Sequence, residues 1–369
     1  MVITKLISQL KNALKLSVMN KTVYLILIAG LISLSNIKAQ EKSTGQPMPL
    51  FQSEEILNLS LEADFKTVFS VTDDSTYFPA VLYLTDNNGL QRTIDIQIRT
   101  RGNIRREKDV CLFTPLRLNF PKNETENTPF EGQKAIKLVT HCNRPDFNEQ
   151  NTMIEYLIYK AYNVLTDSSF KVRPALINYI YSGKKADTVR KFAFFIEREK
   201  HLVDRLRGIE IESKKFNPNL LNPFPSCLMD MFQYMIGNTD YSSYDLHNVV
   251  LVSDSTRRFP PVPIPYDFDW CGLISANYAV PHPVIGTESV SERVYRGFKK
   301  EPFIVQRTIE EFNNRKQAIY DVFENYELLD ADRKSKVIKY LDGFYEVINN
   351  EKKVKVEFFD NARVVNSER

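Results

Sequence analysis

The sequence predicts an α+β protein of two lobes, strand-rich in its first half and helical in its second. Before about residue 200, short runs alternate between apolar and polar residues, the period of a half-buried strand, and later runs show helical spacing. A polar, proline-containing segment at 208–226 follows the strand-rich part. We therefore expect a strand-rich lobe at 40–200, a helical lobe with acidic loops at 201–350, and a C-terminal tail at 351–369.

The composition is that of a globular protein with ample aromatic residues. The 369 residues carry a formal charge of +3, which is close to balance. This charge gives no reason to expect nucleic acid or an acidic surface as a partner. The sequence contains no internal repeat and no nucleic-acid motif, so we expect no nucleic-acid partner.

The N-terminal segment has the pattern of an export signal. A short basic lead precedes an apolar run at 23–34 and a small residue, Ala39. Met19 is an alternative start that would place this lead directly at the beginning of the chain. We expect residues 1–39 to be a signal peptide, and the mature chain to begin near Gln40 in the periplasm or at the cell surface. The run is shorter than the ~20 residues that span a bilayer, so the mature chain is expected to have no membrane span. An uncleaved N-terminal anchor is the alternative.

The chain has four cysteines: Cys111, Cys142, Cys227 and Cys271. An even number allows disulfides in an oxidising compartment, but spacing alone does not assign partners. Buried free thiols are the alternative. The histidines show no zinc-ligand spacing.

The clearest strand signal is the alternation at 93–99, in which Ile94, Ile96 and Ile98 would face the core. The Asp-Asn-Asn-Gly run at 86–89 is typical of a hairpin turn. The other runs with strand character lie at 57–61, 80–84, 115–120, 135–140, 171–181 and 189–196.

A basic loop follows the alternating strand and is built around Gly102. It carries four arginines: Arg99, Arg101, Arg105 and Arg106. Glycine allows close approach of backbone donors, and guanidinium groups neutralise phosphate charge, so the loop is suited to polyphosphate. The alternative is a solvated basic turn.

A strand lysine, Lys137, precedes a predicted helix at 151–165 that has Glu155 in its first turns. Protein kinases show the same order for the lysine and glutamate that pair near the phosphates. Because Glu is common on helices, the default expectation is that Glu155 faces solvent.

Two acidic segments occupy the second half. An apolar helix breaks at Gly237 and leads into a loop that carries Asp240 and, at the start of a strand, Asn248. A second strand ends on Asp267 and Asp269, and two side chains that are two residues apart on an extended tip point the same way.

These acidic segments predict a metal and phosphate site. Carboxylate and amide oxygens suit Mg²⁺, so Asp267, Asp269 and Asn248 are candidate ligands. Asp240 is placed to meet an acceptor hydroxyl in phosphoryl transfer. The alternative is that these residues stabilise turns or cap the next segment. A metal-dependent hydrolase would normally use more acids or histidines.

The remaining elements are predicted helices. Helical character is present at 198–206, and a short basic helix is expected at 289–298. Two long amphipathic helices, broken near 330–332, are expected at 302–350.

Several sequence blocks, taken in order, resemble the CotH-like kinase family. They are RTRGNIRREK with TPLRLNF, AIKLVTHCNRP, FAFFIERE, MIGNTDYSSYDLHNVVLV and PVPIPYDFDW, between about residues 90 and 275. The chain looks most like exported members from Bacteroidetes-type bacteria. The resemblance implies a bilobal, atypical protein-kinase-like fold. The spore-coat members phosphorylate serines of coat proteins, using ATP and a divalent metal.

The resemblance also implies roles for the acidic residues. Asp240 would be the catalytic aspartate, Asp267 the principal metal ligand, and Asp269 its support. Glu197 would lie near the adenine-side hinge.

On the phosphate side, the turn of Arg101, Gly102 and Asn103 would overlie the phosphates. Either Arg117 or Lys137 would be the strand cation that contacts them.

The expected function is therefore that of an exported kinase. It would transfer a phosphoryl group from ATP, with Mg²⁺ or Mn²⁺, to serine or threonine hydroxyls of an exported protein. The alternative is an inactive kinase-fold protein that acts as a binding or assembly module of the cell envelope.

Overall fold

The computed structural model describes residues 45–365, except 72, 74, 144–145, 183–186 and 282. The expected signal peptide at 1–39 lies outside the described residues. Gly45–Arg369 form one compact unit. No helix in the described ranges is both long enough and apolar enough to cross a membrane.

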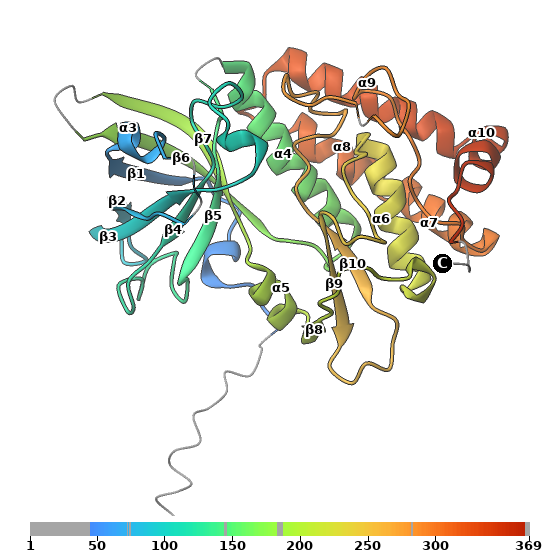
Figure 1. Ribbon diagram of the computed structural model, residues 1–369, viewed down its shortest axis with the longest axis horizontal. Coiled ribbons are helices and arrows are strands. Elements are labelled where there is room, and N and C mark those ends of the chain that lie inside the picture. Colours follow the sequence, from blue (N-terminus) through green and yellow to red (C-terminus); the bar gives the residue numbers. More distant parts are fainter. Residues whose placement is uncertain are drawn as a thin grey trace, which may run out of the picture. The chain divides into compact units, whose positions relative to one another are not determined.

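Seven strands form a closed barrel in the order β1-β2-β3-β4-β5-β7-β6 (Figure 1). Their bounds are Leu57–Ala63 (β1), Phe78–Thr85 (β2), Gln91–Thr100 (β3), Leu116–Asn119 (β4), Ala135–Val139 (β5), Val172–Tyr181 (β6) and Thr188–Ile196 (β7). All neighbouring pairs are antiparallel except β1 and β6, which pair in parallel from Leu57↔Ala175 to Ala63↔Tyr181.

The barrel overturns the predicted bilobal, kinase-like fold. Such a fold has an open strand-rich sheet, whereas β1 here pairs with β2 on one side and β6 on the other, so the sheet closes on itself. Alternation in a sequence shows which face of a strand is buried. It does not show which strands pair, and the closing pair joins segments more than 100 residues apart in sequence.

The strands themselves form where their alternation predicts. Ile94, Ile96 and Ile98 on β3 are at most 3% exposed and face the barrel core. The turn at 86–89 joins β2 to β3, and the Asp86 N–H donates to the Leu90 carbonyl at 2.8 Å. Aromatic side chains fill the rest of this core: Phe65, Phe113, Phe130, Tyr179 and Phe195.

The helix α4 (Asp146–Leu165) lies between the barrel and the helices of the C-terminal part of the chain (Figure 1). It begins earlier than the expected 151, and its buried face contacts β6, β7 and α8. The remaining helices are α3 (Phe65–Val68), α5 (Glu199–Arg205), α6 (Pro223–Ile236), α7 (Pro302–Asn314), α8 (Lys316–Glu324), α9 (Ala331–Ile348) and α10 (Glu351–Lys355).

Two helix predictions are wrong. Residues 289–298 form bends, turns and irregular backbone instead of a basic helix. The stretch 302–350 folds into three helices, because α7 and α8 are separated at Arg315; the expected break before residue 331 is present.

A second sheet has the order β10-β9-β8, with bounds Val262–Pro265 (β10), Val249–Asp254 (β9) and Gly208–Glu210 (β8). Residues 208–226, whose polar, proline-containing sequence suits an interlobe link or a covering loop, contribute β8 and the first turn of α6. In the antiparallel pair β9–β10, Val249 faces Pro265, and the Tyr266 N–H then donates to the Asn248 carbonyl at 3.1 Å. This register brings the two acidic segments together.

Two of the four cysteines form a disulfide, and the other two are buried free thiols, so each of the two alternatives holds for one pair. Cys111 and Cys142 form a disulfide that ties the segment after the basic loop to the end of β5. Cys227 and Cys271 are buried free thiols.

His141 predicts an acid-sensitive fold. It is 1% exposed between Phe113 and Tyr179, and burial, with Lys191 and Arg105 nearby, lowers its pKa to about 3. The pKa of His141 is lower in the folded protein than the value of 6.5 in the unfolded chain. The contribution of neutral His141 to folding stability is therefore fully present above pH 6.5 and is lost as the pH falls toward 3. Protonation should therefore lower the free energy of unfolding by up to about 1.4 kcal/mol per pH unit in that window.

The measurement is urea denaturation between pH 7 and pH 4, with His141→Leu as the comparison. The variant should show a shallower loss of stability, although not a flat profile, because burial also lowers the pKa of His201 to about 4. Equal slopes for the two proteins would contradict the assignment to His141.

Candidate functional site

The loop that carries Asp240 is fixed by the end of α6. Gly237 ends the helix in the left-handed region, with φ 67°, where glycine has no side chain to clash. Asn238 follows and is fully buried. Its side-chain oxygen accepts from the Asp240 N–H at 3.0 Å, and its amide group donates to Gln233 at 3.0 Å. The backbone at Asp240 is therefore held by buried hydrogen bonds.

Both carboxylate oxygens of Asp240 have partners. His247 Nε2 lies 3.0 Å from Oδ1, and Asn248 Nδ2 donates to Oδ2 at 3.1 Å and to the Asp240 carbonyl at 2.8 Å. The Asp240 side chain is 34% exposed and that of His247 is 57% exposed. The structure thus brings Asp240 and Asn248 together, as expected, and adds His247, which the sequence reasoning gave no role.

Asp267 lies two residues after the end of β10 and is in the left-handed region, with φ 63°. Its N–H donates to the Tyr159 hydroxyl of α4 at 2.9 Å. Phe268 is fully buried and packs edge-on against Tyr159 at 4.7 Å between ring centroids. The expected extended tip is therefore wrong, because extended geometry ends at Pro265.

Asp269 is buried, and its Oδ2 accepts from the Tyr278 hydroxyl at 2.9 Å. Burial, followed by the charge of Asp267, raises the pKa of Asp269 to about 7, although Arg105 and Tyr278 act in the opposite direction. The charge of Asp240 raises it further. Asp267 and Asp240 therefore both lie within electrostatic range of Asp269.

Glu155 is also part of this cluster. It is 3% exposed on α4, so the expectation that it faces solvent is wrong. Arg105 Nη1 lies 3.8 Å from its carboxylate, and Arg105 Nη2 donates to the Thr140 carbonyl at 2.6 Å. Lys137, the strand lysine, pairs instead with Glu199 at 2.9 Å. The partner of the helix glutamate is thus an arginine of the basic loop.

Arg105, Glu155 and Asp269 line one small pocket. The rest of its wall is Cys142, Asn148, Asn151, Thr152, Ile274 and Tyr278. Burial, then Asp269, raises the pKa of Glu155 well above its ordinary value, while Arg105 and Arg101 oppose this. Acids from α4 and from the segment that follows β10 therefore face the basic loop of the barrel.

The barrel supplies further cations. Arg99, Arg117 and Lys137 are direct neighbours across β3, β4 and β5. Lys137 Nζ lies 5.5 Å from the ring centre of Tyr266, the residue before Asp267. Both candidate strand cations, Arg117 and Lys137, thus belong to one row. Lys137 lies beside the segment that carries Asp267.

The glycine turn keeps its backbone accessible. Gly102 has φ 93°, a conformation that glycine adopts without strain, and both Gly102 and Asn103 are exposed. Arg101 is half-buried, and its charge lowers the pKa of Glu155, so the turn lies on the same side as the acids.

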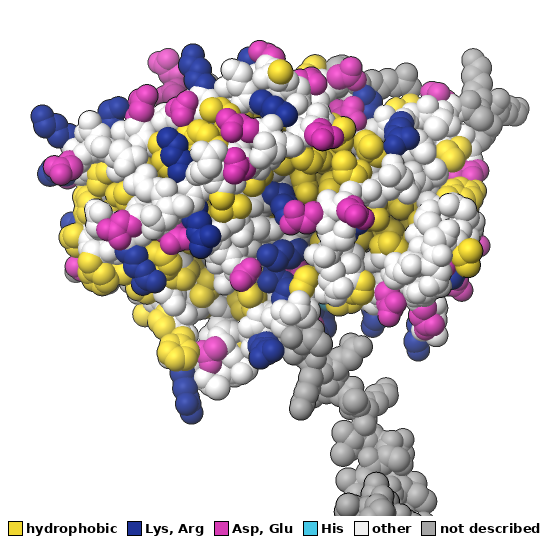
Figure 2. Space-filling view, turned by 180° about the vertical axis from the view of Figure 1, so that it is seen from behind, with side chains coloured by type: hydrophobic (Ala, Val, Ile, Leu, Met, Phe, Trp, Pro, Cys, Tyr) yellow, Lys and Arg dark blue, Asp and Glu magenta, His cyan; other side chains and the backbone are white. Residues whose placement is uncertain are grey.

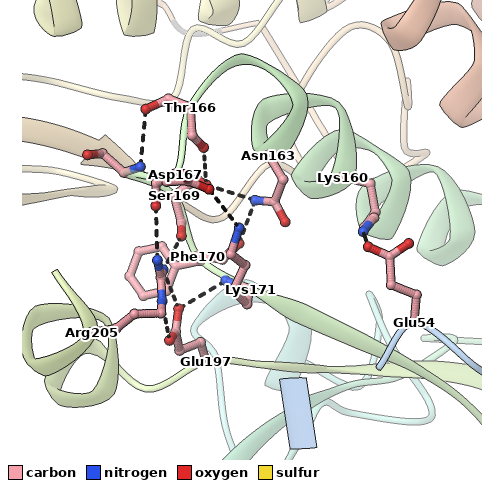
Figure 3. A network of polar contacts seen from close by, with 11 residues as sticks. Glu54, Lys160, Asn163, Thr166, Asp167, Ser169, Phe170, Lys171, Glu197 and Arg205 are labelled. Atoms are coloured by element: carbon pink, nitrogen blue, oxygen red, sulfur yellow. Dashed lines mark hydrogen bonds and ion pairs between the residues drawn. The ribbon is translucent and has the colours of Figure 1, made fainter. Parts of the chain in front are cut away.

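Glu197 belongs to a different network (Figure 3). Arg205 donates to both of its carboxylate oxygens, at 3.0 and 2.9 Å, and the Lys171 N–H donates to Oε2 at 3.1 Å. Arg205 also donates to the Asp167 and Ser169 carbonyls. These bonds tie β7 to α5 and to the connection after α4, so the carboxylate of Glu197 is occupied by groups of the chain.

The donor set fits Mg²⁺ only together with a phosphate. In the described ranges, no three His, Cys, Asp or Glu side chains stand close enough to hold a metal ion. Mg²⁺ is commonly bound by one or two carboxylates plus substrate phosphates and water. Asp267 and Asp269 would supply the carboxylates, and the amide oxygen of Asn248, whose Nδ2 donates to Asp240, would be a third ligand. The crowding of negative charge around buried Asp269 is what a divalent cation would relieve.

Two tyrosines of the site were missed in the sequence. Tyr159 holds the Asp267 backbone and Tyr278 holds the Asp269 carboxylate. Tyr159 belongs to the buried face of α4, and Tyr278 lies in a segment without periodicity, so neither position carries a signal.

A scan against models of known protein families finds no match for this chain, and a search of curated proteins also finds none.

Proposed function

We propose that the protein is a metal-dependent phosphotransferase that moves a phosphoryl group from ATP to a hydroxyl of an exported protein. The observation that carries this proposal is the convergence of Asp240, Asp267 and Asp269 with Glu155 and Arg105 of the basic loop. Phosphoryl transfer needs carboxylates for a metal, cations for the phosphates and an acid beside the acceptor hydroxyl. The cluster contains each of these groups.

Each group has a separate task in this proposal. Mg²⁺ or Mn²⁺, when bound, would neutralise charge on the transferred group. Asp267, Asp269 and Asn248 hold the metal, while Arg101, Lys137 and the Gly102 turn contact the phosphates. The acceptor oxygen bonds to the γ-phosphorus, the bond from that phosphorus to the bridging oxygen breaks, and ADP leaves. Asp240 accepts the hydroxyl proton.

An exported location is part of the proposal. It is supported by the Cys111–Cys142 disulfide, because disulfides persist mainly in oxidising compartments.

The resemblance to the CotH-like family supports the choice of donor and acceptor, but the closed barrel separates the proposal from a kinase-like fold. Label transfer tests it: purified protein with Mg²⁺ and ATP labelled at the γ-phosphate should label a serine-containing acceptor, and chelation of the metal should stop the transfer. Asp245→Asn is the matched control for Asp267→Asn. Asp245 is exposed on the loop that carries Asp240, and its hydrogen bonds are with Ser242 of that loop. Nucleotide binding without any transfer would instead favour a binding module.

His247 provides a smaller test of the same site. Its contact with Asp240 Oδ1 fixes the orientation of the carboxylate, so His247→Ala should lower kcat by about 10-fold, the scale seen when a group that orients a reacting side chain is removed. KM for ATP should not change, because His247 lies on the acceptor side. A rise in the KM for ATP with unchanged kcat would contradict this role.

A further inference from the structure

A group of cations borders the acceptor loop and is not used by the chemistry above. We call it the basic surface, and it consists of Arg296, Lys299, Lys300 and Arg363. The C-terminal segment brings these residues together, because Phe298 and Arg363 form an isolated parallel β-bridge. The Lys299 N–H donates to the Arg363 carbonyl at 2.8 Å, and the Arg363 N–H donates to the Gly297 carbonyl at 2.9 Å. The C-terminal end lies beside α6 and α7 (Figure 1).

The basic surface is joined directly to Asp240. Arg296 Nη1 donates to the carbonyl of Thr239, the residue before Asp240. The Arg296 guanidinium also lies 5.9 Å from the ring centre of Tyr241, the residue after Asp240. A segment whose hydroxyl reaches Asp240 would therefore pass along these cations.

The charges of the basic surface are compensated only in part, because Asp240 and Asp245 of the acceptor loop lie within electrostatic range of Arg296. Elsewhere, exposed lysines have partners, such as Lys336 with Asp332 at 2.7 Å and Lys355 with Asp360 at 2.8 Å. Among the described residues, none of the four members makes a salt bridge. Asp230, whose pKa Lys300 and Arg363 lower against the larger effect of burial, is itself buried and bonded to Tyr241.

We propose that the acceptor is an acidic segment, with Asp or Glu side chains within a few residues of the hydroxyl that is phosphorylated. The inference rests on the proposed role of Asp240. Complementary charge steers a partner to its site and holds it there over about one Debye length, ~8 Å at physiological salt. The net charge of the whole chain, +3, is close to balance and gives no indication of this local basic surface. The face of the molecule drawn in Figure 2 carries interspersed positive and negative side chains over its described part.

The test compares two serine peptides that differ only in whether the flanking residues are Glu or Gln. Lys299→Glu with Lys300→Glu reverses two charges without touching the Arg296–Thr239 contact. Lys66→Glu is the control, because Lys66 is exposed on α3, at the barrel and away from α6 and α7 (Figure 1). Binding is measured by fluorescence anisotropy and transfer by labelling, both at low and physiological salt.

The native protein should bind the Glu peptide about 10-fold more tightly than the Gln peptide, and the double variant should lose this preference, whereas Lys66→Glu should keep it. Transfer to the Gln peptide should be the same in all three proteins. Equal binding of both peptides by the native protein would overturn the inference, and retained transfer would leave the proposed function standing. Binding of the Glu peptide without any transfer would support the surface and count against the proposed function. Equal peptide binding together with loss of binding to phosphatidylserine vesicles in the double variant would assign the surface to lipid instead.

Discussion

Replacing Asp267 by asparagine is expected to lower phosphoryl transfer by at least ~100-fold, because loss of a direct metal ligand should exceed the 10–100-fold cost of losing a group that only supports one. The fold should be preserved for a specific reason. Asp267 has φ 63°, and asparagine is one of the few residues other than glycine that adopts this conformation readily. The Tyr159 hydrogen bond uses the backbone N–H and is unaffected by the substitution.

The stability of Asp267→Asn distinguishes the loss of a metal ligand from the loss of the fold as the cause of lost activity. The charge of Asp267 raises the pKa of buried Asp269, so removing that charge relieves repulsion and should leave the free energy of unfolding unchanged or slightly increased. Labelled-ATP transfer and urea denaturation on the same preparations measure both quantities. Because the metal site needs phosphate oxygens, metal affinity should be compared with nucleotide present. Full activity in the variant would show that Asp267 is not a metal ligand.

Replacing Glu197 by alanine is expected to destabilise the protein by about 3–5 kcal/mol, the cost of leaving one partner of a buried ion pair uncompensated. The side chains of Glu197 and Arg205 are 0% and 5% exposed. Alanine would leave the Arg205 guanidinium with only the carbonyls of Asp167 and Ser169 (Figure 3). This would be the largest loss of stability among the substitutions considered.

Glu199→Ala is the matched control for Glu197→Ala. Glu199 pairs with Lys137, but the side chains are 40% and 26% exposed, so the loss should be within about 1 kcal/mol. Chemical denaturation of the three proteins measures the difference. If Glu197→Ala keeps its stability and loses only nucleotide affinity, Glu197 acts at the nucleotide, as the family resemblance implies, and the structural role is wrong.

The strands were predictable from the sequence because alternation reports burial directly. The closed barrel was not, since its closing pair depends on the register of β1 against β6, and no local pattern encodes that contact. A strand-rich half followed by a helical half is compatible with several architectures. The resemblance to a kinase-like fold selected the wrong one.

The acidic residues of the candidate site were also predictable, because Asp and Asn at strand ends form recognisable segments. Their geometry was not. Asp267 leaves the extended region, and Glu155 turns inward to Arg105 although a helix glutamate usually faces solvent. Both outcomes depend on contacts between β10, α4 and the basic loop, which lie far apart in the sequence.

The most direct test of the proposed phosphotransferase site is a crystal structure with Mg²⁺ and a non-hydrolysable ATP analogue. We expect a metal ion on Asp267, with phosphate oxygens between it and the Gly102 turn or Lys137, and the terminal phosphate turned toward Asp240. A nucleotide bound away from Asp267 and the basic loop, or a metal ion held without these aspartates, would show that the acidic segments and the basic loop do not form this site.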